Sequence, residues 1–269
     1  MQPVANMEAM YTQIHSQAIV SPKAKIGDNV KIGPAVIIGD NVTIGSGTSI
    51  DAFAQIIGNT KIGKNCRIFS YAILGNIPQD LKYKGERSFL IVGDNNIIRE
   101  FVTMNVGTEE DSKTIIGNNN LIMAYSHVAH DCVIGDNNVL ANCATLAGHV
   151  TIENKVTVGG LVAIHQFCRL GTLSMVGGCS KVVQDVPPYS ICDGHPAIVH
   201  GLNSVGLKRA GMAEENVRML KKAFKILFFD NHLFNSAEVL LKKEVPLTKE
   251  IDYLLQFMSS SKRGIGRQH

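Results

Sequence analysis

The chain has 269 residues, of which 45% are hydrophobic and 18% are charged, and this balance predicts a globular protein with a buried core. The formal net charge of +3 is too small to indicate nucleic-acid binding by itself. No segment approaches the roughly 18 consecutive apolar residues of a membrane-spanning helix, and the start lacks the pattern of a signal peptide. We therefore expect a cytoplasmic protein.

Residues 1–13 are expected to form an N-terminal extension, because a repeat begins at residue 14. From there every sixth residue is aliphatic through eleven positions: Ile14, Val20, Ile26, Ile32, Ile38, Ile44, Ile50, Ile56, Ile62, Ile68 and Leu74. A short run follows at Val92, Ile98 and Met104. A third run begins at Ile116 and continues in steps of six to Val182, again with an aliphatic residue at all twelve positions.

A period of six fits neither an α-helix nor a simple hairpin, but it fits a short strand and a turn stacked coil on coil. Three hexads complete one triangular coil, so residues 18 apart stack at the strand spacing of about 4.8 Å. The predicted fold is mainly β, a parallel β-helix of hexapeptide repeats over residues 14–192. Two segments, 76–90 and 105–114, interrupt the repeat and are expected to loop out from one face.

A small C-terminal α-helical domain is predicted over residues 193–269. Helical spacing of apolar residues appears in "AEENVRMLKKAFKILFF", "SAEVLLKKEV" and "TKEIDYLLQFMSSS". Ser236 and Thr248 are candidate N-caps of the second and third helices. The last residues, "KRGIGRQH", are expected to be frayed.

The stretch "AYSHVAHDCVIGD" at residues 124–136 holds two histidines and an aspartate. Counting in coils of 18 places Asp131 beside His149, and places His130, Gly148 and Gln166 in one column. His130 and Asp131 are adjacent in the chain, so they pair only if the chain turns there. The stacking of Asp131 on His149 is the alternative pairing.

Two chemistries fit this cluster. His127, His130 and His149 supply three imidazoles for a zinc ion, as in a hydratase. Alternatively, a neutral histidine takes a proton from a hydroxyl that attacks a thioester, while a carboxylate orients the ring. A glycine N–H then approaches the oxyanion. A third alternative is a scaffold without catalytic activity.

The chain resembles the UDP-N-acetylglucosamine 3-O-acyltransferases, which are hexapeptide-repeat acyltransferases. The motifs that carry this resemblance are "PQDLKYKGE" at 78–86, "HVAHDC" at 127–132, "LAGHV" at 146–150, "AIHQF" at 163–167 and "GLNSVGLKRAG" at 201–211. The resemblance implies a left-handed parallel β-helix. It also implies transfer of a 3-hydroxyacyl chain from acyl carrier protein to the sugar 3-hydroxyl, the first step of lipid A biosynthesis, without a metal or another cofactor.

The resemblance also implies roles for single residues. His130 is implied as the general base, Asp131 as the residue that orients it, and the N–H of Gly148 as the oxyanion donor. Gly178 is implied to lie where the acyl chain ends, and an open groove there favours a long chain. The other implied substrate-binding positions are Asp80, Lys82, His127, His149, His165, Gln166, Asn203 and Arg209.

A homotrimer is implied as well, with active sites between subunits. The acidic acyl carrier protein is expected to meet a basic surface made of Lys208, Arg209, Lys221, Lys222 and Lys225. N-acyl transfer to a UDP-sugar with a 3-amino group remains an alternative reaction.

Overall fold

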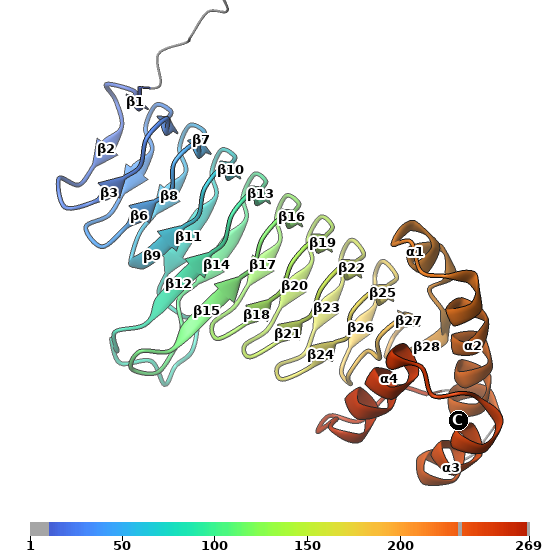
Figure 1. Cartoon of the computed structure of the whole chain (residues 1–269). Helices are drawn as coiled ribbons and strands as arrows, with labels where there is room; N and C mark the ends of the chain where they lie inside the picture. Colours follow the sequence, from blue (N-terminus) through green and yellow to red (C-terminus); the bar gives the residue numbers. More distant parts are fainter. Residues whose placement is uncertain (1–10, 231–232, 268–269) are drawn as a thin grey trace, which may run out of the picture.

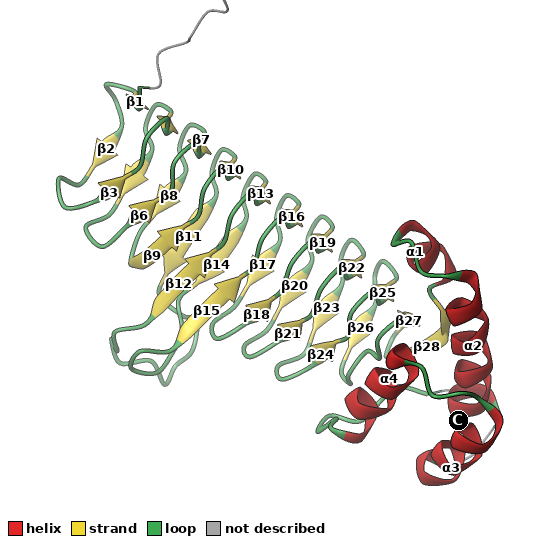
Figure 2. Ribbon diagram, viewed as in Figure 1, coloured by secondary structure: helices red, strands yellow, loops and turns green. Residues whose placement is uncertain are grey.

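The computed structural model describes residues 11–230 and 233–267. The chain winds into a long three-sided coil, and its helices pack at the C-terminal end of that coil (Figures 1 and 2). Residues 1–10, most of the expected N-terminal extension, lie outside the described residues.

Three sheets form the sides of the coil, and we call them sheets A, B and C. Sheet A contains β1 (Gln13–Ile14), β4 (Lys31–Ile32), β7 (Ser49–Ile50), β10 (Arg67–Ile68), β13 (Ile97–Ile98), β16 (Leu121–Ile122), β19 (Val139–Leu140), β22 (Thr157–Val158), β25 (Met175–Val176), β27 (Ser190–Gly194) and β28 (Ala197–Leu202). Sheet B contains β2 (Ile19–Val20), β5 (Ile37–Ile38), β8 (Gln55–Ile56), β11 (Ile73–Asn76), β14 (Thr103–Asn105), β17 (His127–Val128), β20 (Thr145–Leu146), β23 (Ala163–Ile164) and β26 (Lys181–Val182). Sheet C contains β3 (Lys25–Ile26), β6 (Thr43–Ile44), β9 (Asn59–Ile62), β12 (Phe89–Val92), β15 (Lys113–Ile116), β18 (Val133–Ile134), β21 (Thr151–Ile152) and β24 (Arg169–Leu170).

The aliphatic residue of each hexad points into the coil. Ile32, Ile50 and Ile68 stack in register through parallel pairs of β4, β7 and β10, and each is at most 3% exposed. Neighbouring coils therefore bury one another's side chains along a continuous core. The prediction of a mainly β, left-handed parallel β-helix with a small helical C-terminal part is confirmed.

Short strands leave room for a tight turn after each hexad. Many of these turns place a non-glycine residue at positive φ, such as Asp131 at 58° and His149 at 60°. This conformation helps the chain turn from one sheet onto the next, so polar side chains can project from the corners of the coil.

The two interruptions leave the coil at the corner between sheets B and C. The first connects β11 to β12 through residues 77–88, and the second connects β14 to β15 through residues 106–112. Figure 1 shows both extending from the same edge of the coil. We call them loop 1 and loop 2.

Beyond the last coil, β27 and β28 form an antiparallel pair, so sheet A continues past residue 192. The helices are α1 (Ser204–Arg209), α2 (Glu214–Phe224), α3 (Phe234–Glu244) and α4 (Lys249–Ser259), and a π-helix, η1 (Lys225–Phe229), continues α2. Thr248 caps α4 as predicted, because its side chain accepts a hydrogen bond from the Ile251 N–H. The prediction for Ser236 is wrong, since the N-cap of α3 is Leu233, three residues earlier.

The C-terminal tail is ordered onto the coil through residue 267, which corrects the expectation of fraying. Asp185 N–H donates to the carbonyl of Gly264, and Val199 N–H donates to the carbonyl of Gly266. Residues 268–269 lie outside the described residues. In the part of the chain that the structure describes, every helix is too short or too polar to cross a bilayer.

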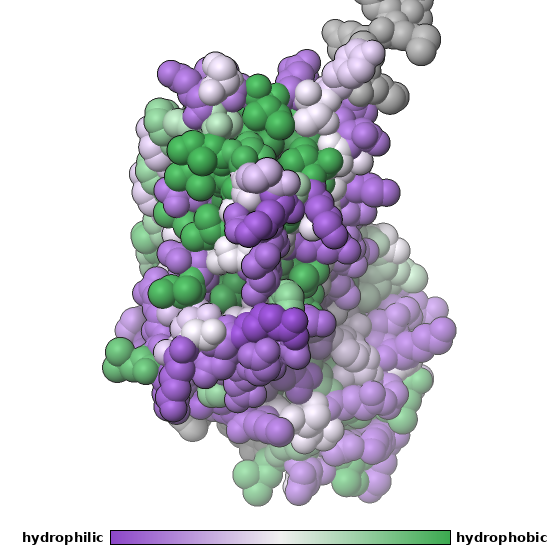
Figure 3. Space-filling view, turned by 90° about the vertical axis from the view of Figure 1, so that its left-hand side faces the viewer, coloured by the Kyte–Doolittle hydropathy of each residue, from purple (hydrophilic) through white to green (hydrophobic). Residues whose placement is uncertain are grey.

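The opposite end of the coil is more open. Ile14, which pairs in register with the buried Ile32, is itself 49% exposed there, since no described coil covers it. Figure 3 looks onto this end of the molecule and shows hydrophobic surface gathered in its upper half.

Candidate active site

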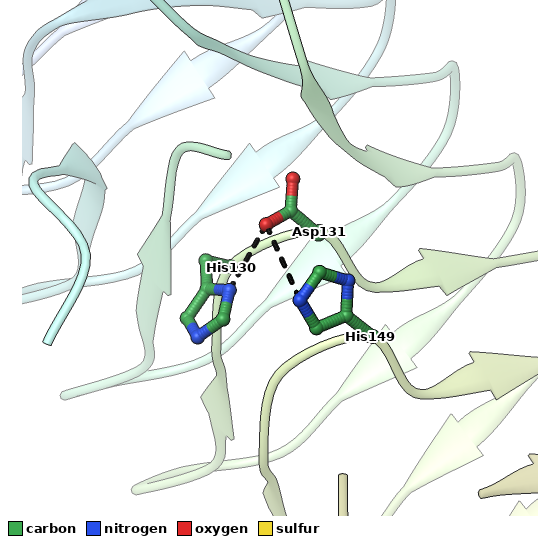
Figure 4. A group of neighbouring side chains, drawn as sticks. All are labelled: His130, Asp131 and His149. Atoms are coloured by element: carbon green, nitrogen blue, oxygen red, sulfur yellow. Dashed lines mark hydrogen bonds and ion pairs between the residues drawn. The ribbon is translucent and has the colours of Figure 1, made fainter. Parts of the chain in front are cut away.

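The cluster of interest lies at the corner between sheets B and C. The chain leaves β17, turns at Asp131 with φ at 58°, and enters β18. This turn brings the Asp131 carboxylate beside the ring of the preceding residue, with 3.0 Å between Asp131 Oδ2 and His130 Nδ1 (Figure 4). The adjacent residues therefore pair, which the sequence left open.

His149 occupies the equivalent turn one coil further on. Its Nε2 lies 3.9 Å from the same Asp131 oxygen, so the alternative pairing is present as a longer contact (Figure 4). The His149 N–H donates to the carbonyl of His130 at 3.0 Å. The His149 ring stacks on Phe167, with centroids 4.6 Å apart, which fixes its plane. The coil count thus predicted this neighbourhood correctly.

Loop 2 holds the carboxylate of Asp131 from the other side. Thr108 Oγ1 donates to Asp131 Oδ2 at 2.6 Å, and the Thr108 N–H donates to the same oxygen at 3.2 Å. The Asp131 N–H donates to Thr114 Oγ1 at 2.8 Å. No pattern in the sequence indicates this role for Thr108, because loop 2 has no period that would place it against a particular coil.

These contacts decide the charge of Asp131. Partial burial raises the pKa of its carboxyl, but hydrogen bonds from Thr108, His130 and Ser112 lower it by more, and the resulting pKa lies below the ordinary value. An ionised carboxylate only accepts hydrogen bonds, so Nδ1 of His130 carries the hydrogen. Nε2 of a neutral His130 is then left with a free lone pair.

Gly148 packs directly against the His130 ring. A Cβ at this position would lie 2.3 Å from His130 Cε1 and 2.6 Å from Nε2. Only a glycine therefore allows the ring to occupy this place. Among the described residues, the Gly148 N–H has no hydrogen-bond acceptor, so it is available to an oxygen of a ligand.

A pocket of about 340 Å³ opens beside these groups. Asp80 and Lys82 from loop 1, Thr108 from loop 2 and His149 contribute to its lining. Asp80 Oδ2 lies 4.0 Å from His130 Nε2, too far for a hydrogen bond, and Asp80 Oδ1 accepts from the Lys82 N–H at 2.8 Å. Asp80 and Lys82, two of the predicted substrate-binding residues, thus lie beside the histidine pair formed by His130 and His149.

His127 lies on the outer face of β17, on the coil that carries His130. Its Nδ1 is 2.7 Å from Thr103 Oγ1 on the preceding coil. Burial lowers the pKa of His127, and the neighbouring His130 lowers it further. At neutral pH the ring is therefore uncharged, which suits a hydrogen-bonding role.

This low pKa leads to a prediction about stability. Because the pKa of folded His127 lies below the unfolded value of about 6.5, the unfolded chain binds more protons just below pH 6.5. We expect the His127 contribution to make the free energy of unfolding fall as pH decreases from about 7 to 5.5, by less than about 1.4 kcal/mol per pH unit. His127→Asn should flatten the curve, as measured by urea denaturation of both proteins across this range. An identical slope would contradict this.

The other predicted site residues lie farther away. His165 and Gln166 follow β23 and are exposed. Gly178 lies at a different corner, between sheets A and B, with Gly160 as its nearest neighbour. A single chain therefore does not bring Gly178 to the histidine pair.

Asn203 and Arg209 lie at the two ends of α1, Asn203 as its N-cap and Arg209 as its last residue. The Asn203 side chain caps this helix by accepting from the Gly206 N–H at 3.0 Å, and it donates to the Leu173 carbonyl at 2.9 Å. Both ends of its amide are thus used within the protein. Arg209 is the last residue of α1 and is exposed.

The ligand atoms of His130, Asp131 and His149 all lie within 4.8 Å of one another, a spacing compatible with a metal ion. Within residues 11–230 and 233–267, this is the group that meets that spacing, and it does not include His127. A single chain therefore does not bring the three imidazoles of His127, His130 and His149 within that spacing.

Comparisons with known proteins address the activity. A curated acyl-[acyl-carrier-protein]–UDP-N-acetylglucosamine O-acyltransferase of Thermodesulfovibrio yellowstonii is 52% identical over 95% of this chain and 99% of its own length. The corresponding protein of Aliarcobacter butzleri is 50% identical over 94% and 97%. The chain belongs to the UDP-N-acetylglucosamine O-acyltransferase family.

Solved structures and family descriptions agree with this assignment. LpxA from Acinetobacter baumannii superposes with a TM-score of 0.90 at 43% identity, covering 94% of this chain and 99% of its own. The Francisella novicida UDP-N-acetylglucosamine acyltransferase gives 0.90 at 40% identity, covering 95% and 94%. Three family descriptions match parts of the chain: "Udp N-acetylglucosamine O-acyltransferase; Domain 2" at residues 185–266, "Bacterial transferase hexapeptide (six repeats)" at 113–148 and "GMPPB C-terminal domain" at 14–108. The protein is an acyltransferase enzyme.

Proposed function

We propose that this enzyme moves a 3-hydroxyacyl chain from acyl carrier protein to the 3-hydroxyl of UDP-N-acetylglucosamine, as the first step of lipid A biosynthesis in the cytoplasm. The curated relatives carry the donor and acceptor in their names. The observation that carries the mechanism is the 3.0 Å contact of His130 Nδ1 with Asp131, because it leaves Nε2 free to accept a proton.

In this mechanism, Nε2 of His130 takes the proton of the sugar hydroxyl as its oxygen attacks the thioester carbonyl carbon. The oxyanion that forms accepts a hydrogen bond from the Gly148 N–H. The carbon–sulfur bond then breaks, and the imidazolium returns its proton to the leaving thiolate. Asp131 stabilises the imidazolium in between without itself taking the proton.

The nucleotide sugar is proposed to lie along the same edge of the coil. Asp80 and Lys82 in loop 1 hold the sugar and diphosphate, while His127 and His149 hydrogen-bond to the substrate beside His130.

Arg209 supplies a cation suited to the diphosphate. His165 and Gln166 contact the substrate two coils above His130, and Asn203 acts through the α1 helix that it caps.

A homotrimer explains why Gly178 lies at another corner. Sheet B lies between the corner of His130 and the corner of Gly178, so two copies that pack through this face would bring one corner of each together. The second corner also carries exposed aromatic side chains in a stacked row, with ring centroids 4.8–5.0 Å apart: Phe53, Tyr71, Phe101 and Tyr125. Exposed apolar surface of this kind favours a protein interface.

The proposed acyl groove gives a prediction about chain length. A Cβ at Gly178 would meet only the Gly160 carbonyl oxygen, at 3.3 Å, and Gly160 N, at 3.9 Å, so a longer side chain can extend into open space. We expect Gly178→Met to shift the preferred donor to a chain several carbons shorter, because the side chain shortens the groove. Competition between donors of different length measures this shift. An unchanged preference would place the end of the groove elsewhere.

The donor protein is expected at the helical end. A pocket of about 350 Å³ lies between α1 and α2, with Met212 and Val217 as apolar lining and Lys208, Arg218 and Lys221 as cations. An acidic carrier protein suits such a surface.

The function is tested by incubating purified protein with UDP-N-acetylglucosamine and 3-hydroxyacyl carrier proteins of several lengths. Formation of the 3-O-acyl product supports the proposal. Transfer only to a 3-amino UDP-sugar would change the acceptor but keep the mechanism. No transfer from any donor, together with stoichiometric zinc in the purified protein, would favour a metal site at His130, Asp131 and His149.

A further inference from the structure

The C-terminal tail brings a cation to His165, one of the proposed substrate-binding residues. After α4, the tail runs along the last coil and is fixed at both ends of a short stretch. Ser261 Oγ donates to the buried Asp185 at 2.7 Å, and the Gly264 carbonyl accepts from the Asp185 N–H at 2.8 Å. Arg263 lies between these two anchors, so its side chain leaves the tail from a defined place.

The Arg263 guanidinium points at the edge of the coil that carries the histidines. Its Nη2 donates to the carbonyl of Val183 at 3.0 Å and lies 3.3 Å from Nδ1 of His165. Within the described part of the chain, Arg263 forms no ion pair. The guanidinium of Arg263 therefore contacts uncharged polar groups of the coil, and no ion pair with a carboxylate of the described residues holds it in this position.

The contact with His165 fixes the position of a hydrogen. A guanidinium only donates, so Nδ1 of His165 must accept, and the ring hydrogen is placed on Nε2. In this arrangement the Nε2–H of His165 can donate to a substrate oxygen.

Without Arg263, the local backbone would favour the opposite tautomer. Nδ1 of His165 also lies 3.1 Å from the carbonyl of Gln166, and a carbonyl only accepts. That contact alone would place the hydrogen on Nδ1 and turn Nε2 into an acceptor. The contact with Arg263 requires Nδ1 to accept a hydrogen bond, whereas the contact with the Gln166 carbonyl requires Nδ1 to donate one. The contact with Arg263 is charge-assisted and therefore the stronger.

We propose that Arg263 is a positioning residue of the acyltransferase, which holds His165 in the tautomer that donates a hydrogen bond from Nε2 to an oxygen of the nucleotide-sugar substrate. This inference rests on the proposed function for the identity of the substrate. The contact between Arg263 and His165 itself is present in the protein without substrate.

The first test needs no substrate. Histidine labelled with ¹⁵N reports which ring nitrogen is protonated, and the His165 signal is assigned by its loss in His165→Ala. We expect Nε2–H in the wild type and in the matched control Lys262→Met, which makes the same change at the exposed neighbouring residue. Arg263→Met should shift His165 toward Nδ1–H, and Arg263→Lys, which still donates, should restore much of the original state. A His165 spectrum unchanged by Arg263→Met would overturn the proposal.

The second test is a double-mutant cycle in the acyl-transfer assay. Arg263→Met should lower kcat/KM for the nucleotide sugar about tenfold, the effect of losing one hydrogen bond to the substrate, and mainly through KM. In a His165→Ala background the same change should cost less than about twofold, because its target is gone. An equal loss in both backgrounds would show that Arg263 does not act through His165 and would overturn the proposal. If the wild type transfers no acyl chain, the proposed function fails, while the spectra still decide the Arg263–His165 link.

Discussion

His130→Ala should lower the rate of acyl transfer by about 10²- to 10⁴-fold while the protein stays folded. The ring supplies the free Nε2 lone pair that accepts the hydroxyl proton, and water cannot replace it in the same geometry. The side chain is only 13% exposed and lies in a corner outside the aliphatic core, so its loss should affect activity far more than stability.

The measurement is steady-state acyl transfer at saturating donor, together with thermal unfolding of each protein. His15→Ala is the matched control, because His15 is an exposed histidine on the first coil, far along the chain from the site. If a folded His130→Ala protein were as fast as the wild type, another group would be the base and the mechanism would be wrong.

Gly148→Ala should reduce the rate about a hundredfold by moving the same ring. The added Cβ would lie 2.3 Å from His130 Cε1, so the ring must shift by roughly 1 Å or more, and a displacement of this size in a reacting group costs about that factor. The contact of Nδ1 with Asp131 would be strained in the same movement.

Gly160→Ala separates this effect from a general effect on the turns. Gly160 occupies the equivalent turn position at another corner, and a Cβ there meets only the Asn142 carbonyl oxygen, at 3.4 Å. We expect the unfolding temperature of Gly160→Ala to stay close to that of the wild type. A crystal structure of Gly148→Ala with His130 in its original place and full activity would contradict the argument.

Periodicity decided how much of this molecule could be predicted. Because residues 18 apart stack on adjacent coils, the neighbourhood of Asp131 and His149 follows from counting alone. The pairing of His130 with Asp131 does not, since it depends on a positive φ at one turn residue. No pattern in the sequence indicates that Asp131 adopts a positive φ.

The residues that escaped prediction lie where the period stops. Thr108 reaches Asp131 from loop 2, and Arg263 reaches His165 from the tail, across 98 positions of sequence. Their positions depend on how irregular segments fold back onto the coil, and no local pattern encodes that path. The short helix α1 was missed for a similar reason: its six residues are too few to show a helical repeat.

In the three-sided coil, the sheet that a residue joins depends on its position counted in steps of six residues. Leu74 and Val92 are separated by 18 residues and Met104 and Ile116 by 12, yet each pair occupies consecutive sheets, as residues six apart do elsewhere. Loops 1 and 2 therefore insert whole multiples of six residues without changing which sheet the following strand joins. A six-residue deletion inside a coil would instead move every later residue onto the preceding sheet. Such a deletion between loop 2 and residue 127 would carry His130 and Asp131 away from the corner where the loops meet them.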